Sequence, residues 1–126
     1  MGQEPRTDCK EMTYAGRNPT DSAPLRISQI KGIALDAERL PIDACVGVFT
    51  EPDHTLIAFT ATDDNGHFDL TGLPEGNYRL VVKSAYAGFC PANAKVQIDR
   101  RLKTKKTLSA QMRRADSGVC SYIETK

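Results

Sequence analysis

Acidic side chains around a short turn are the first candidates for chemistry in this chain of 126 residues. Asp63, Asp64 and Asp69 cluster near Asn65, and oxygen donors of this kind bind calcium. A calcium loop needs ligands at alternate positions followed by a bidentate Glu at the twelfth, and counting from Asp63 puts Pro74 there. The spacing therefore favours a turn over a metal site.

The two histidines, His54 and His67, offer no better start for catalysis. Neither has a cysteine or serine beside it in a recognised spacing, so a nucleophile, a base and an orienting group cannot be named. We expect no catalytic residue, no metal and no cofactor.

Four cysteines, Cys9, Cys45, Cys90 and Cys120, are spread along the chain with no two closer than 30 residues. Structural zinc sites draw their ligands in close pairs, which this spacing does not provide. An even number of distant cysteines indicates two disulfides and an oxidising compartment. The alternative is four buried thiols in a cytosolic domain. We expect a secreted, periplasmic or cell-envelope protein.

Size and charge limit the remaining classes. The length suits one domain, and a net charge of +1 argues against a nucleic-acid partner. No apolar run approaches the roughly 20 residues of a membrane span. Residues 1–14 lack the apolar segment of a signal peptide, so we expect a mature form from which a signal peptide was removed.

Short apolar runs separated by turn residues predict an all-β domain. Residues 1–24 contain three prolines and two glycines and are expected to form an extended arm, followed by a β-sandwich at 25–126. Asn65-Gly66 between apolar segments predicts a β-hairpin. The seven expected strands cover residues 26–36, 44–50, 55–62, 67–70, 77–84, 94–99 and 106–113.

The run from Thr62 to Leu80 contains a T-D-x-x-G-x-F segment followed by L-P-x-G-x-Y. It resembles the signature of carboxypeptidase regulatory-like domains. This resemblance implies a transthyretin-like, seven-stranded Greek-key β-sandwich that serves as a non-catalytic module. The motif residues have structural roles, because glycines permit turns, proline fixes φ and aromatic bodies pack. They are Asn65, Gly66, Phe68, Leu73, Pro74, Gly76 and Tyr78.

The resemblance also implies a disulfide pairing. In that fold the second and fifth strands are antiparallel neighbours, which implies a Cys45–Cys90 bridge together with a Cys9–Cys120 bridge. Four cysteines allow three connectivities, and the sequence alone leaves all of them open.

Related sandwiches include enzymes. Hydroxyisourate hydrolases end in a Tyr-Arg-Gly-Ser tail, whereas this chain ends Ser121-Tyr122-Ile123-Glu124-Thr125-Lys126. We therefore expect a non-enzymatic structural or interaction module. The alternatives are a carbohydrate- or small-ligand-binding domain and a transthyretin-related enzyme.

Two surfaces are candidates for contact with a protein partner or an envelope polysaccharide. If Val46 and Val48 face the core, Phe49 faces outward, as Phe59 on the next strand is expected to do. Either the arm or a second chain, as in a homodimer, should cover this outer face. The other surface is a run of basic residues. It forms either a solvated turn or a patch that binds an acidic polysaccharide or an envelope lipid. It contains Arg100, Arg101, Lys103, Lys105 and Lys106.

Overall fold

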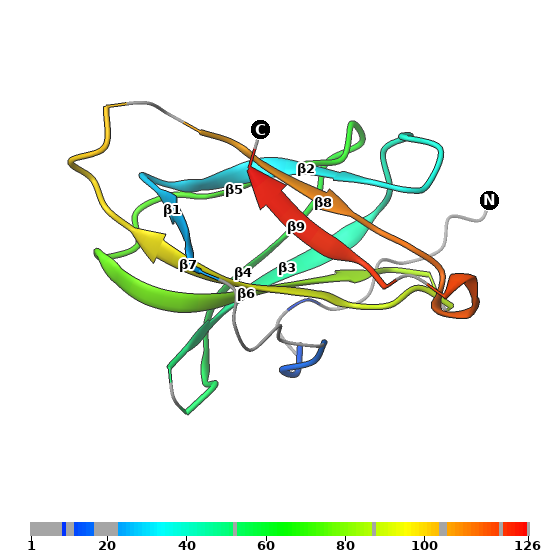
Figure 1. Ribbon diagram of the computed structural model, residues 1–126, viewed down its shortest axis with the longest axis horizontal. Helices are drawn as coiled ribbons and strands as arrows, with labels where there is room; N and C mark the ends of the chain where they lie inside the picture. The colour runs from blue at the N-terminus through cyan, green and yellow to red at the C-terminus, as the bar shows by residue number, and fades with distance from the viewer. Residues whose placement is uncertain are drawn as a thin grey trace.

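Two β-sheets face each other and form a sandwich (Figure 1). A computed structural model describes residues 9, 12–16, 23–51, 53–86, 88–103, 106–118 and 120–125. One sheet has the strand order β1-β7-β6-β3-β4 and the other β5-β2-β8-β9. The strands are β1 (Leu25–Ile27), β2 (Ile30–Leu35), β3 (Ala44–Thr50), β4 (Leu56–Ala61), β5 (His67–Leu70), β6 (Gly76–Ser84), β7 (Ala92–Ile98), β8 (Leu108–Gln111) and β9 (Tyr122–Thr125).

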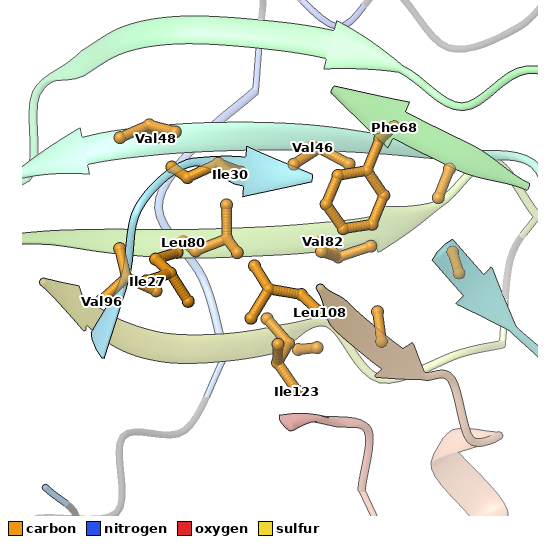
Figure 2. Packing of buried hydrophobic residues seen from close by; sticks show 14 of the residues in the cluster. Ile27, Ile30, Val46, Val48, Phe68, Leu80, Val82, Val96, Leu108 and Ile123 are labelled. Atoms are coloured by element: carbon orange, nitrogen blue, oxygen red, sulfur yellow. The ribbon is translucent and has the colours of Figure 1, made fainter. Parts of the chain in front are cut away.

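Alternation along the strands places apolar side chains of both sheets in the space between them (Figure 2). Val46 and Val48 of β3 face this core, as expected, and β6 contributes Leu80 and Val82. From the other sheet, Phe68 of β5 joins the same cluster. The described part of the chain contains no helix long and apolar enough to cross a bilayer.

The expected strand at 26–36 is in fact two strands, β1 and β2, in different sheets. Ile27 and Ile30 are both fully buried in the core. In one continuous strand, residues three apart would point to opposite faces. A bend at Ser28-Gln29 allows both isoleucines to face inward while the chain crosses between the sheets.

A second extra strand, β9, pairs antiparallel with β8 and lies outside the region of resemblance. Its buried residue, Ile123, packs into the main core. The described residues therefore contain nine strands, not seven. The bounds expected for 44–50 and 67–70 are confirmed.

The turn at Asp63–Gly66 is tight, but the hairpin prediction is wrong. Strands β4 and β5 belong to different sheets, so they are not hydrogen-bonded partners. β5 pairs with β2 instead, and the N–H of Ala34 donates to the Gly66 carbonyl at 2.8 Å. The turn thus carries the chain from one sheet to the other.

The disulfides join Cys9 to Cys45 and Cys90 to Cys120, with Cα atoms 5.3 and 5.5 Å apart. All four cysteines are bridged, but the expected pairing is wrong. Cys45 lies opposite Lys83 of the neighbouring strand β6 and, next to the core residue Val46, faces the outer side of the sheet. There it meets Cys9 of the arm.

Cys90 lies in the connection between β6 and β7. Its N–H donates to the Arg113 carbonyl at 2.9 Å, and its carbonyl accepts a hydrogen bond from the Ser121 hydroxyl at 2.7 Å. These bonds hold Cys90 against the C-terminal segment, which carries Cys120.

Candidate functional site

The Asp63 carboxylate stabilises the turn between the sheets. Its Oδ1 accepts hydrogen bonds from the backbone N–H groups of His67 and Asn65, both at 2.9 Å. The His67 bond is the main reason why the pKa of Asp63 lies below its usual value. Gly66 has a φ of 79°, which a residue with a side chain rarely adopts. Asp63 and Gly66 therefore have structural roles.

The remaining motif residues fix the entry into β6 and the core. Tyr78 is buried, and its hydroxyl donates to the Pro74 carbonyl at 2.7 Å. Gly76 between them has a φ of 152°. Phe68 lies beside Gly32, where an added Cβ would be 2.9 Å from Phe68 Cζ, and Leu73 packs against the same cluster.

A second apolar cluster covers part of the outer face of the five-stranded sheet. Cys9 and Met12 of the arm pack there with Cys45, Phe49 and Val81 of the sheet. Phe49 is only 2% exposed as a result. The described part of the arm thus lies across the face that the sequence predicted to need a cover.

Further polar contacts hold the arm in place. The Tyr14 ring stacks on His54 with centroids 3.7 Å apart and meets Phe49 edge to face. Two hydrogen bonds continue across the sheet, from Lys83 Nζ to Thr13 Oγ1 at 3.0 Å and from Asn93 Nδ2 to the Ala15 carbonyl at 2.8 Å.

Phe59 lies on the same outer face, opposite Gly47 in the register of β3 and β4. It is 46% exposed, and Ile57, which falls at an irregularity in that register, is 44% exposed. Within the described residues, the arm covers Phe49 but leaves these two side chains partly exposed to solvent.

The basic run forms part of the turn between β7 and β8. The Arg100 N–H donates to Glu75 Oε2 at 2.8 Å, and its guanidinium donates to the Leu73 carbonyl. Arg101 Nε pairs with Asp99 Oδ1 at 3.2 Å, although the Arg101 side chain is 87% exposed. Lys105 lies outside the described residues.

Arg26 of β1 also reaches this turn, which the sequence analysis missed. Its Nη2 lies 2.8 Å from Asp99 Oδ2, so Asp99 stands between two guanidinium groups. Hydrogen bonds from Arg101 first, and then from Arg26, lower the pKa of Asp99 to about 2. No sequence signal relates residues 73 positions apart; the parallel pairing of β1 with β7 brings them together.

Two hollows accompany these elements. A groove of about 720 Å³ lies along β5 and β2, where Lys31 stands opposite Asp69 and His67 opposite Ile33. A smaller cavity of about 250 Å³ lies beside Arg100. Among the described residues, no three His, Cys, Asp or Glu side chains are grouped so that they could hold a metal ion.

A search of solved structures finds a similar fold in 5-hydroxyisourate hydrolase from Klebsiella pneumoniae. The TM-score is 0.52, the sequence identity is 17%, and the match covers 84% of this chain and 97% of that chain. The fold is a transthyretin-like β-sandwich. At this identity the likeness extends to the fold alone. No protein-family model matches the sequence, and a search of curated proteins gives no significant match.

Proposed function

We propose that this transthyretin-like domain is a non-enzymatic structural or interaction module of an exported or cell-envelope protein, of the carboxypeptidase regulatory-like type. The observation that carries the proposal is the use of both disulfides. The Cys9–Cys45 bridge fastens the N-terminal arm to β3, and the Cys90–Cys120 bridge joins the connection between β6 and β7 to the connection between β8 and β9. This design suits a scaffold that must stay folded outside the cell.

The use of the polar side chains supports a scaffold over a catalyst. Asp63 holds a turn, Asp99 joins two arginines, and the Arg79 guanidinium pairs with Glu51. Of the histidines, His54 stacks on an arm tyrosine. Carboxylates that already accept hydrogen bonds within the fold are poorly placed to act as a base or a nucleophile on a substrate.

The motif geometry supports the carboxypeptidase regulatory-like assignment. The resemblance implies that the glycines, the proline and the aromatic residues of the motif have structural roles. In the structure Gly66 and Gly76 adopt positive φ, Pro74 accepts the hydrogen bond of Tyr78, and Phe68 and Tyr78 pack in the core. The exposed Phe59 offers an apolar contact for a protein partner or a second copy.

An activity assay separates this proposal from the enzyme alternative. The full chain is mixed with 5-hydroxyisourate, and the loss of ultraviolet absorbance is followed beside the Klebsiella enzyme as a positive control. We expect the same decay as in buffer. A decay rate that rises in proportion to the concentration of this protein would contradict the non-enzymatic proposal.

Cell fractionation tests the compartment. Intact cells of the natural host are treated with a thiol-alkylating reagent and separated into cytosolic and envelope fractions. We expect the protein outside the cytosolic fraction with its cysteines unmodified. Recovery with a cytosolic marker and with alkylated cysteines would contradict export.

A further inference from the structure

One end of the sandwich gathers three connections that are far apart in the sequence. They are the bend between β1 and β2, the loop between β5 and β6, and the turn between β7 and β8 (Figure 1, left). We call the described parts of residues 25–29, 71–75 and 99–107 the basic end. Its cavity of about 250 Å³ is lined by all three connections, including Ser28, Gln29, Thr71, Leu73, Arg100 and Leu102.

The charge of the basic end differs from that of the chain as a whole. Its acids are Glu75 and Asp99, and its bases are Arg26, Arg100, Arg101, Lys103 and Lys106, an excess of three positive charges. The whole chain has a net charge of +1. Positive charge is therefore concentrated at this end of the sandwich, where Arg100 lines the cavity.

The arginines are held in place but keep donors for a ligand. A guanidinium has five N–H donors. Arg101 uses Nε for Asp99, and Arg26 uses Nη2 for the same carboxylate. The side chains of Arg101 and Arg26 are 87% and 56% exposed. Planar groups fixed in this way suit carboxylates, because little side-chain freedom is lost on binding.

The cavity supplies groups for a small hydroxylated ligand. Ser28, Thr71 and Gln29 provide polar side chains, while Leu73 and Leu102 provide apolar surface. The Ser28 hydroxyl is buried and has no hydrogen-bond partner among the described residues, so it is free to turn toward a ligand. The volume lies just below the roughly 300 Å³ at which drug-sized pockets begin, so it suits one sugar ring.

We propose that the basic end binds an acidic polysaccharide, with one carboxylate-bearing sugar unit in the cavity beside Arg100 and neighbouring units along Arg101 and Arg26. The inference rests on the proposed role as an interaction module. A lipid surface fits less well, because the exposed large apolar side chains of the described residues all lie outside the basic end. They are Leu40, Ile57, Phe59, Tyr86 and Tyr122.

The test uses the full, disulfide-bonded chain and oligogalacturonate as the probe. Nitrogen-15 NMR spectra and calorimetry are recorded at about 10 mM and about 150 mM salt, which changes the screening length from roughly 30 to 8 Å. We expect binding at low salt, with shifts at Ser28, Thr71 and Arg100, and about tenfold weaker binding at high salt. The methyl-esterified oligomer, which lacks the charge, should not bind.

Two charge-reversal variants locate the site. Arg101→Glu should weaken binding about tenfold, equivalent to about 1.4 kcal/mol. Arg39→Glu, an exposed arginine outside the basic end, should leave it unchanged. Thr71→Val provides a cavity variant that keeps the charge and should also weaken binding. Unfolding curves check that each variant is folded.

Three results would overturn this proposal: no binding at low salt, equal loss in Arg101→Glu and Arg39→Glu, or binding to vesicles of anionic lipid in preference to the oligomer. None of them would bear on the module proposal itself, which depends on the hydrolase assay and the fractionation.

Discussion

The Sδ atom of Met12 lies 2.9 Å from the point where a Cβ atom on Gly47 would stand. The arm therefore occupies space that a glycine in the middle of β3 leaves open. With the Cys9–Cys45 bridge at one end of this contact, the described arm is an integral part of the fold.

Removing the arm's disulfide should loosen the outer face. The double variant Cys9→Ser, Cys45→Ser loses a bridge that closes 36 residues, which is worth about 4 kcal/mol in the chain-entropy model. We expect a lower free energy of unfolding in urea and faster hydrogen exchange at Phe49 and Val81, because the arm then leaves them more often.

The matched control is the double variant Cys90→Ser, Cys120→Ser, whose bridge closes 30 residues. It should lose a similar amount of stability while Phe49 and Val81 stay protected. Equal loss of protection in both variants would mean that the arm does not shield this face.

Two glycines with positive φ allow strain to be separated from contact. Gly66 and Gly72 have φ values of 79° and 92°. An added Cβ would meet the Ala34 carbonyl oxygen at 2.8 Å in Gly66→Ala, but nothing within 4 Å in Gly72→Ala. We expect losses of about 3 and about 1 kcal/mol, measured by urea unfolding. Similar losses would contradict the packing of this turn against β2.

The Tyr78 hydroxyl should contribute to stability through one hydrogen bond. Tyr78→Phe keeps the buried ring but leaves the Pro74 carbonyl without its donor. We expect a loss of about 1 kcal/mol in the free energy of unfolding. An unchanged or higher stability would show that the bond to Pro74 is not formed in solution.

Acid should destabilise the fold partly through Asp99. Its folded-state pKa of about 2 lies below the usual 3.8, so the carboxylate stabilises the fold above pH 3.8 and this contribution is lost as the pH falls toward 2. Asp99→Asn removes this dependence. Thermal melts between pH 4 and pH 2 should therefore fall less steeply for the variant, and parallel curves would contradict the pairing with Arg26 and Arg101.

Strands with strong local patterns were predictable from sequence. In β3 every second residue from Val46 to Val48 is a valine, and turn residues flank the strand. The structure confirms both bounds of the expected strand. The resemblance of the motif to carboxypeptidase regulatory-like domains likewise implied the sandwich. Within the motif, Tyr78 hydrogen-bonds to Pro74 and Gly66 adopts a positive φ, and both features are local to the chain.

Features that depend on distant segments were not predictable. The bend after Ile27 follows from the need to bury two isoleucines three residues apart. The hairpin prediction failed because partner choice, unlike turn geometry, depends on β2. The disulfide pairing failed because Cys45 faces the arm, and Arg26 reaches Asp99 only through parallel strands.

Disulfide mapping of the protein isolated from its natural host tests the central claim most directly. Digestion without reduction, followed by mass spectrometry, should yield linked peptides that contain Cys9 with Cys45 and Cys90 with Cys120. A Cys45–Cys90 linkage, or four free thiols, would contradict an exported sandwich whose arm and C-terminal segment are fastened by disulfides.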